Sequence, residues 1–265
     1  MPGAVLRYPG GKFRAKKFIV PLFEECDTVA SPFFGGGHVE LALGQLGKRV
    51  TASELYYPVA AIWQEAKENA DRLATEAEKY LRDTRDLKKE MFNQIQKELD
   101  QLLKEQDKDR FEIAVRAYVS NRASFSGLVF GSGVGDAKEW NPLALERLRN
   151  VDMTNVEVLQ GDYWDTLFSS GQEYDGVYAD PPYALGKASE LYGHKGSTHR
   201  NFDHERFGEH MEILKSKCKI VISYNDCELV RKLFDGWEFR EVEWKYGMGN
   251  KGGAKKSNEV LIVNS

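Results

Sequence analysis

Cysteines and long apolar runs are scarce in this chain of 265 residues. The three cysteines, Cys26, Cys218 and Cys227, have neither metal-ligand spacing nor the pattern of a disulfide framework. No segment approaches the roughly eighteen consecutive apolar residues of a membrane span, and the N-terminus lacks the apolar stretch of a signal peptide. We therefore expect a cytoplasmic protein that needs no metal, no disulfide and no membrane.

An excess of basic residues is also absent, because 37 Lys and Arg stand against 41 Asp and Glu, for a net charge of −4. This balance argues against a protein that coats nucleic acid through its overall charge. Phosphate binding, however, needs only a local cluster of cations. Two segments hold such clusters: residues 187–200 with Lys195, and residues 245–256 with Lys255 and Lys256. Either segment has a simpler interpretation as a solvated loop.

Short apolar runs separated by glycine-rich turns and helical segments are present along much of the chain. Hydrophobic residues make up 42% and charged residues 29%, as in ordinary soluble globular proteins. The runs that we expect to form strands are residues 28–30, 49–53, 156–159, 176–179, 219–223 and 260–263. Their alternation with helical segments predicts an α/β fold, with a mixed sheet and helices on both of its faces.

A charged block without glycine or proline interrupts this pattern between residues 61 and 108. Apolar side chains recur there every four residues, as on one face of a helix (Leu87, Met91, Ile95, Leu99 and Leu103). A second helical segment and a glycine-rich loop at residues 127–135 follow. We predict a catalytic domain formed by residues 1–60 and 151–265, with residues 61–150 inserted as a helical subdomain. The alternative is a plain helical layer that covers the sheet.

The tetrapeptide Asp180-Pro181-Pro182-Tyr183 directly follows the expected strand at residues 176–179. The Asp180 carboxylate and the neighbouring carbonyl can accept hydrogen bonds from an NH2 group. The Tyr183 ring offers a flat face on which a base can stack, and the two prolines restrict the backbone. This combination is expected of an enzyme that methylates the exocyclic amine of a nucleobase. Taken alone, the four residues are explained equally well by a tight turn.

A glycine loop, Pro32-Phe33-Phe34-Gly35-Gly36-Gly37, follows the first expected strand and opens a helix. Gly35 and Gly37 allow the backbone to approach a ligand closely. Glu54 lies about twenty residues on, at the end of the next strand, where an acid can accept hydrogen bonds from ribose hydroxyls. The spacing disfavours a dinucleotide, because Glu40 occupies the position of the third glycine, and no phosphate-binding Gly-Lys-Ser/Thr is present. S-adenosylmethionine is therefore the preferred cofactor.

Two further sites fit an adenosine-bearing cofactor. Asp162 follows the strand at residues 156–159, where it can bind an adenine edge. Near the N-terminus, Tyr8 offers an aromatic face and Lys12 a cation for a methionine-like carboxylate. Each residue also has an ordinary explanation, Asp162 as a helix N-cap and Lys12 as a surface charge. In combination with the glycine loop and the tetrapeptide, they favour the cofactor.

These motifs resemble the D12, or Dam-type, class of adenine-specific DNA methyltransferases. Residues 7–12 are similar to its N-terminal Lys-Trp-x-Gly-Gly-Lys motif, with Tyr8 in place of tryptophan, and residues 32–37 and 180–183 to its glycine loop and catalytic tetrapeptide. The resemblance continues through Asn121-Arg122, Phe125 and residues 201–203, 223–226 and 258–262. There are two departures from the family pattern. Ser31 stands where the family has an acidic residue before Pro-Phe, and the segment after Leu128 is short and glycine-rich where family members often carry a longer basic hairpin. GATC is therefore not assumed as the target.

The resemblance implies a Rossmann-like sheet that depends on S-adenosylmethionine and carries an inserted helical target-recognition domain. It implies cofactor contacts at Tyr8, Lys12, Glu54 and Asp180, with Phe34, Gly35, Gly37 and Asp162 as additions. The implied contacts with DNA are Asn121, Arg122, Ser124, Lys195, Lys255 and Lys256.

We therefore expect methyl transfer to adenine N6 in double-stranded DNA, by base flipping and direct in-line transfer. We also expect a monomer, with a cognate restriction endonuclease as a candidate partner. The alternatives are methylation of cytosine N4, methylation of RNA or protein, a catalytically silent DNA-binding module of the same fold, and a hydride-transfer enzyme. The first alternative usually has serine in place of Asp180.

Overall fold

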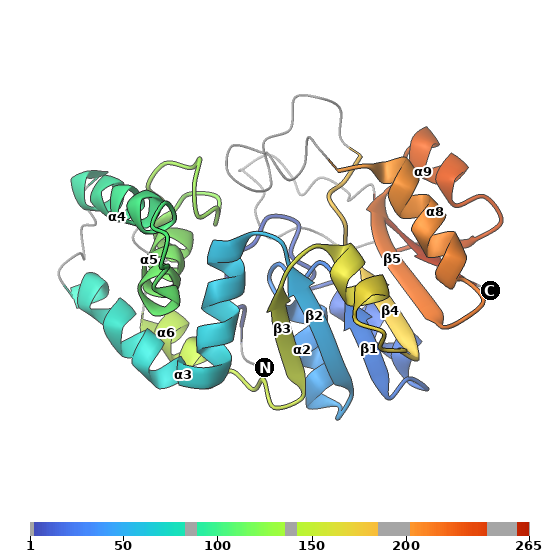
Figure 1. Ribbon diagram of the computed structural model, residues 1–265, viewed down its shortest axis with the longest axis horizontal. Helices are drawn as coiled ribbons and strands as arrows, with labels where there is room; N and C mark the ends of the chain where they lie inside the picture. The colour runs from blue at the N-terminus through green and yellow to red at the C-terminus, as the bar shows by residue number, and fades with distance from the viewer. Residues whose placement is uncertain (1–2, 83–88, 136–141, 185–201, 243–258, 265) are drawn as a thin grey trace.

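The computed structural model describes residues 3–82, 89–135, 142–184, 202–242 and 259–264. Its centre is a seven-stranded sheet in the order β3-β2-β1-β4-β5-β7-β6, with helices packed against it (Figure 1). The strands are β1 (Thr28–Ser31), β2 (Arg49–Glu54), β3 (Val156–Gln160), β4 (Gly176–Ala179), β5 (Lys219–Asn225), β6 (Glu238–Glu241) and β7 (Glu259–Val263). The first five are parallel, and β7 is antiparallel to β5 and β6. The predicted α/β fold with a mixed, Rossmann-like sheet is confirmed.

Both faces of the sheet are buried, and successive strand residues alternate between two hydrophobic clusters. In β4, Val177 and Ala179 belong to one cluster and Tyr178 to the other. Helices α8 (His204–Leu214) and α9 (Glu228–Leu233) cover the first face, through residues such as Phe207. Helices α1 (Lys16–Ile19) and α2 (His38–Gln45) contribute to the second, through residues such as Leu43. This burial on both sides explains why the strands are short runs of apolar residues.

The strand order reverses beside β1. The chain runs from β1 outward to β2 and then to β3, and it returns to place β4 on the other side of β1. Val29 pairs with Gly176 and Ala30 with Val177, so β1 and β4 end at the same edge of the sheet. In open α/β sheets a crevice for ligands forms where the order reverses, outside the carboxyl ends of the strands. The glycine loop and the Asp180 tetrapeptide both leave from this position.

A helical block joins β2 to β3 and extends to the left of the sheet in Figure 1. It consists of α3 (Tyr57–Arg82), α4 (Lys89–Leu102), α5 (Arg110–Ala123) and α6 (Pro142–Arg149). The predicted apolar stripe packs inward at Met91, Ile95, Leu99 and Leu103, whereas Leu87 lies outside the described residues. One hydrophobic cluster runs from the sheet into these helices, so the insertion shares its core with the sheet.

Helix α3 spans the predicted domain boundary at residue 61. Its backbone leaves the helical region at Asn69, with φ −143° and ψ 38°. Before this kink the helix contacts the glycine loop and the sheet. The Trp63 indole donates to the Gly35 carbonyl in the loop at 2.9 Å, and Lys67 donates to the Val156 carbonyl in β3 at 2.9 Å. The division into domains stays a prediction. Across the described ranges, no helix is both long enough and apolar enough to cross a membrane.

Candidate active site

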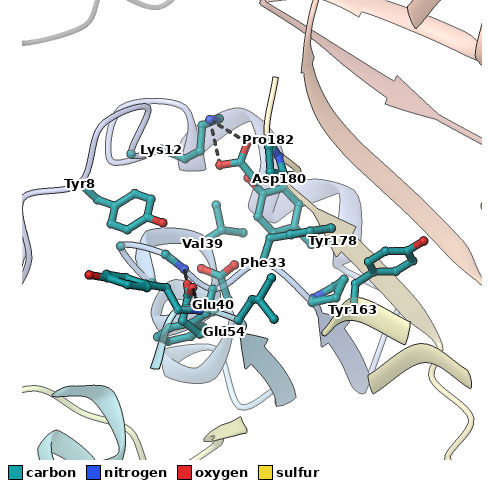
Figure 2. Close-up of a pocket in the computed structure, with 18 of the residues that line it drawn as sticks. Tyr8, Lys12, Phe33, Val39, Glu40, Glu54, Tyr163, Tyr178, Asp180 and Pro182 are labelled. Atoms are coloured by element: carbon teal, nitrogen blue, oxygen red, sulfur yellow. Dashed lines mark hydrogen bonds and ion pairs between the residues drawn. The ribbon is translucent and has the colours of Figure 1, made fainter. Parts of the chain in front are cut away.

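A cavity of about 680 Å³ opens at the carboxyl ends of β1, β2 and β4. It brings together predicted site residues from five distant segments of the chain (Tyr8, Lys12, Phe34, Gly35, Gly37, Glu54, Asp162, Asp180 and Pro182). In Figure 2 the side chains of Lys12 and Asp180 point toward each other across this space, and those of Glu40 and Glu54 lie below them. Cavities of this size are typical of cofactor and small-molecule sites.

The glycine loop after β1 forms the floor beneath Tyr8. Gly35 has φ +49° and Gly37 has φ +66°, in the left-handed region that favours glycine. A Cβ atom on Gly35 would lie only 2.9 Å from the Tyr8 ring, so a larger residue would collide with it. Phe34 is buried under the loop, with its ring edge-on to Trp63 at 5.1 Å. These contacts hold the loop backbone open toward the cavity.

Glu54 fastens the end of β2 to this loop. One of its carboxylate oxygens accepts the Gly35 N–H at 2.9 Å, and the other accepts the Tyr56 N–H at 2.8 Å. Burial raises the pKa of Glu54, and these two backbone hydrogen bonds oppose the effect. Each carboxylate oxygen keeps a further lone pair. Glu54 can therefore accept hydrogen bonds from a ligand's hydroxyl groups while it holds the loop.

Asp180 lies at the end of β4 and is bound by two donors. The Lys12 ammonium lies 2.9 Å from each of its carboxylate oxygens and also donates to the Gly10 carbonyl at 2.7 Å. The Ser223 hydroxyl, from β5, donates to Asp180 Oδ1 at 3.0 Å and lies 3.0 Å from the Tyr178 hydroxyl. The Lys12 side chain is 4% exposed and that of Asp180 22%. The carboxylate is thus anchored on one side and open to the cavity on the other.

The end of the tetrapeptide is tied to β5. The Ala184 N–H donates to Asn225 Oδ1 at 2.8 Å, and the Asn225 amide reaches back to the Ala184 carbonyl at 3.4 Å. The Tyr183 ring stacks on Tyr224 with centroids 6.0 Å apart, and the Lys12 ammonium lies 5.0 Å from its centre. Asn225 lay within a segment of the family resemblance, but no role was predicted for it. Its contact joins two residues that lie 41 positions apart in the chain.

Asp162 stands at the opposite wall of the cavity, just beyond β3. It is half-buried, and its side chain accepts the Trp164 N–H at 3.0 Å. Aromatic residues that we did not predict surround it: Phe33 stacks on Tyr163 at 5.8 Å and 27°, and Phe202 also lines the cavity. Phe33 and Phe202 lie within motifs that the sequence indicated, and Tyr163 follows Asp162, which is the signal that could have identified them. Together they form an apolar wall beside the Asp162 carboxylate.

Two buried glutamates near the cavity were not predicted as site residues. Glu40 on α2 accepts a hydrogen bond from the Ser31 hydroxyl at 2.6 Å. Burial raises the pKa of Glu40 to about 7. Glu259 begins β7, and burial raises its pKa to about 7 as well, against the attraction of the Lys12 ammonium. Sequence spacing alone identified neither, because each acquires its neighbours through the fold.

The charges that line the cavity favour a cation over an anion. Carboxyl groups of Glu40, Glu54, Asp162, Asp180 and Asp203 face two basic groups, Lys12 and Arg206. His38 adds no charge at neutral pH, because burial and the nearby lysines lower its pKa to about 4. A pyrophosphate would be repelled here, whereas a sulfonium would be attracted. Within the described ranges, no cluster of three or more His, Cys, Asp or Glu has the arrangement of a metal site.

The residues predicted to contact DNA through α5 are buried. Asn121 is 1% exposed, Arg122 4% and Ser124 0%. Asn121 accepts the Arg7 N–H at 3.0 Å and donates to the carbonyls of Arg7 and Gly127 at 2.7 and 2.5 Å. These positions suit residues that support the N-terminal segment rather than ones that touch a ligand directly. Their contact with DNA stays a prediction.

Lys195, Lys255 and Lys256 lie outside the described residues. Their contact with DNA also stays a prediction.

Solved structures of similar architecture cover most of the chain at low similarity. Precorrin 8w decarboxylase from Methanobacterium thermoautotrophicum is 14% identical, with a TM-score of 0.38 over 97% of this chain and 91% of that one. Precorrin-6y C5,15-methyltransferase from Geobacter metallireducens is 9% identical, with a TM-score of 0.40 over 94% and 86%. Magnesium protoporphyrin IX methyltransferase from Synechocystis, with bound S-adenosylmethionine, is 11% identical, with a TM-score of 0.36 over 97% and 81%. A search of curated proteins found no match.

A Rossmann-like sheet with a glycine loop after β1, an acid at the end of β2 and the Asp180 tetrapeptide after β4 is the arrangement of an S-adenosylmethionine-dependent methyltransferase. The sequence model of the D12 class N6 adenine-specific DNA methyltransferases matches residues 8–248. The chain belongs to this family. It is therefore an enzyme, and its cofactor is S-adenosylmethionine. The predicted family and cofactor are confirmed.

Proposed function

We propose that this enzyme transfers the methyl group of S-adenosylmethionine to N6 of adenine within a specific sequence of double-stranded DNA. The observation that carries the proposal is the position of Asp180. Its carboxylate leaves β4 at the point where the strand order reverses, and it faces the same cavity as the glycine loop and Glu54. A hydrogen-bond acceptor for an amine and a site for an adenosine-bearing cofactor thus share one space.

The residues that line the cavity fit the cofactor. The Glu54 carboxylate would accept the ribose hydroxyls, and Asp162 would bind the adenine edge beside the aromatic wall. Tyr8 and Lys12 would hold the methionine end, whose carboxylate would accept one of the three N–H groups of the Lys12 ammonium. A Cβ atom on Gly35 would fill the space between its backbone and the Tyr8 ring. The absence of a side chain there supports a close approach of the cofactor to the loop backbone. S-adenosylmethionine supplies a methyl group that forms a C–N bond as its C–S bond breaks, with the electron pair left on sulfur.

Asp180 would activate the target amine. The exocyclic nitrogen of adenine is conjugated with its ring and is a poor nucleophile. Hydrogen bonds from N6 to the Asp180 carboxylate and the Pro181 carbonyl would localise the lone pair and stabilise the positive charge that develops on attack. Ser223 and Asn225 hold both ends of the tetrapeptide through hydrogen bonds of 3.0 and 2.8 Å. Such a fixed geometry supports in-line transfer, since alignment of the reactants accounts for much of the acceleration.

Adenine inside a duplex cannot reach this cavity, so we propose that it is flipped out and stacked on Tyr183. We propose residues 61–150 as the target-recognition domain. Phe125, just beyond α5, supports this assignment because its aromatic side chain is 70% exposed. The Arg7 guanidinium donates to the Phe125 carbonyl at 2.9 Å, which ties this exposed ring to the segment that holds Tyr8. Lys195, Lys255 and Lys256 are the proposed phosphate contacts.

Nucleoside mass spectrometry tests this function. Unmodified DNA of varied sequence would be incubated with the protein and S-adenosylmethionine, digested and analysed for methylated bases. We expect N6-methyladenine. N4-methylcytosine would retain the mechanism but contradict the base assignment. The absence of any modified base would contradict the proposed DNA substrate, and a repeat with RNA would then test the nearest alternative.

A further inference from the structure

We propose that Glu259 is a positioning residue that takes the Lys12 ammonium from Asp180 when the target amine arrives. This inference rests on the proposed function, because it assigns a part in the same reaction to a carboxylate that the sequence motifs did not indicate. It explains how Asp180 can accept a hydrogen bond from an amine although its carboxylate is already paired with the Lys12 ammonium.

In the structure the Asp180 carboxylate already has two partners, Lys12 and Ser223. Both of its carboxylate oxygens lie 2.9 Å from the Lys12 ammonium, and Ser223 donates to one of them at 3.0 Å. A carboxylate paired with an ammonium at this distance is a weaker acceptor for a neutral amine, because its charge is already compensated. For N6 to bind at full strength, Lys12 has to shift toward another anion.

Glu259 is that anion. Its carboxylate lies 3.8 Å from the Lys12 ammonium, which also donates to the Gly10 carbonyl at 2.7 Å. Glu259 begins β7 and pairs in register with Asn225 of β5, the residue that holds the end of the tetrapeptide. The Glu259 side chain is 5% exposed, so water screens the attraction poorly. A movement of roughly 1 Å would bring Lys12 to hydrogen-bond distance from Glu259.

The charges around Glu259 make this transfer responsive to pH. Lys12, Asp180, Tyr183 and Tyr178 are the titratable groups that act on it or are acted on by it. Burial raises the pKa of Glu259 to about 7, whereas Lys12 and the Tyr183 hydroxyl oppose the rise. Burial also raises the pKa of Tyr178 well above its ordinary value, so its hydroxyl keeps its proton near neutrality. Below pH 7 Glu259 is neutral and leaves Lys12 on Asp180, and above it the Glu259 anion attracts Lys12.

The test is the pH dependence of the single-turnover methylation rate in wild-type protein and in Glu259→Gln. The glutamine has nearly the same shape but carries no charge. We expect the two rates to be similar near pH 6 and the wild type to be faster by about tenfold near pH 8.5, the factor that one pKa unit of electrostatic free energy provides. The control is Glu65→Gln, a buried glutamate that pairs with Arg110 in the insertion, whose rate relative to wild type should not change with pH.

A rate ratio between wild type and Glu259→Gln that is constant over this pH range would overturn the proposal. It would show that the effect of the substitution does not depend on the charge of Glu259 and is purely structural. If Glu259→Gln does not fold, as judged by circular dichroism, Glu259→Asp replaces it. In Glu259→Asp the midpoint of the rise in rate with pH should differ from that of the wild type, because the shorter acid has a different pKa at this site. The same midpoint in both proteins would also contradict the inference. Failure of the proposed function is distinguishable, because the wild-type protein would then produce no N6-methyladenine at any pH.

Discussion

At the scale of single residues, the site depends on carboxyl groups that the fold removes from water. Glu54, Glu40 and Glu259 are each 7% exposed or less, and burial raises the pKa of all three. Backbone N–H groups donate to Glu54 and the Ser31 hydroxyl donates to Glu40, whereas the Lys12 ammonium lies 3.8 Å from Glu259, beyond hydrogen-bond distance. Unpaired charges are costly in such surroundings. Glu40 and Glu54 line the cavity, so both carboxyl groups are placed to act on a bound ligand.

Replacement of Glu54 by glutamine should weaken the binding of S-adenosylmethionine. The ribose hydroxyls would lose a charged acceptor, and hydrogen bonds to charged groups contribute about 1.5–3 kcal/mol, or roughly ten- to a hundredfold in Kd. Isothermal titration calorimetry with the cofactor measures the effect. Glu157→Gln is the matched control, because this exposed glutamate lies on the neighbouring strand β3. Equal affinity in both variants would remove Glu54 from the cofactor site.

Replacement of Glu40 by glutamine should change how stability depends on pH. The folded protein raises the pKa of Glu40 from 4.5 to about 7, so between these values it retains a proton that the unfolded chain releases. The free energy of unfolding therefore falls as pH rises through this window, and the variant should lack this part of the decline. We expect the stability of the variant relative to wild type to increase by at most about 3 kcal/mol between pH 5 and pH 8.

Urea unfolding at the two pH values measures this difference, with the exposed Glu173→Gln as control. The same pH dependence in wild type and Glu40→Gln would show that Glu40 is not protonated in the folded state.

The catalytic and cofactor motifs were recognisable in the sequence because each combines several functional residues within a few positions. Glu259, Asn225 and Ser223 carry no such local pattern. Their roles arise from a strand pairing and a loop contact between segments more than 30 residues apart. Nor could residue type reveal that Asn121 and Arg122 are buried, since polar residues in a helix are usually exposed.

At the scale of elements, the N-terminal segment connects the insertion to the cofactor cavity. Asn121 on α5 binds the Arg7 backbone in both directions, and the Arg7 guanidinium returns hydrogen bonds to the carbonyls of Ser124 and Phe125. Tyr8, the next residue in the chain, lines the cavity. The C-terminal end of α5 thus helps to position Tyr8, a residue that lines the cavity.

Replacement of Asn121 by alanine should therefore weaken cofactor binding from a distance. Loss of these buried hydrogen bonds leaves backbone groups unsatisfied and should cost about 1–3 kcal/mol of stability. Because Tyr8 follows Arg7, part of this loss should also weaken cofactor binding. If half of the cost destabilises the cofactor complex, the Kd for S-adenosylmethionine should rise by roughly two- to tenfold. Thermal unfolding and calorimetry measure the two effects. Asn150→Ala, at an exposed asparagine after α6, should change neither.

A lower stability with unchanged cofactor affinity would contradict this link. It would show that Asn121 supports only the insertion.

Most strands could be predicted because burial on both faces makes them apolar runs, as in β4 and β5. Strand β6 was missed, since Glu238-Phe239-Arg240-Glu241 at the sheet edge is mainly charged and partly exposed. Helix α6 was also not predicted, because its eight residues follow the glycine-rich loop and offer only two turns of periodicity. The predicted boundary at residue 61 falls within α3, and the kink of this helix at Asn69 has no evident signal in the sequence.

At the scale of the whole molecule, a net charge of −4 means that DNA must be bound through local clusters of cations. If Lys255 and Lys256 contact phosphates, their replacement by alanine should weaken DNA binding and reduce the slope of log K against log salt concentration by about two, one for each contact. Lys48→Ala with Lys217→Ala is the control, because these residues precede β2 and β5 at the opposite edge of the sheet from the cavity. An unchanged slope would return residues 245–256 to the solvated-loop interpretation.

We propose that Asp180 carries methyl transfer to adenine N6 at the point where the strand order of the sheet reverses. The most direct test is the single-turnover rate of Asp180→Ala on methylatable DNA, with DNA affinity measured in parallel. We expect a rate at least about a hundredfold below wild type, because the developing charge on N6 loses its acceptor, while DNA affinity is largely retained. Wild-type turnover by Asp180→Ala would contradict this role of Asp180.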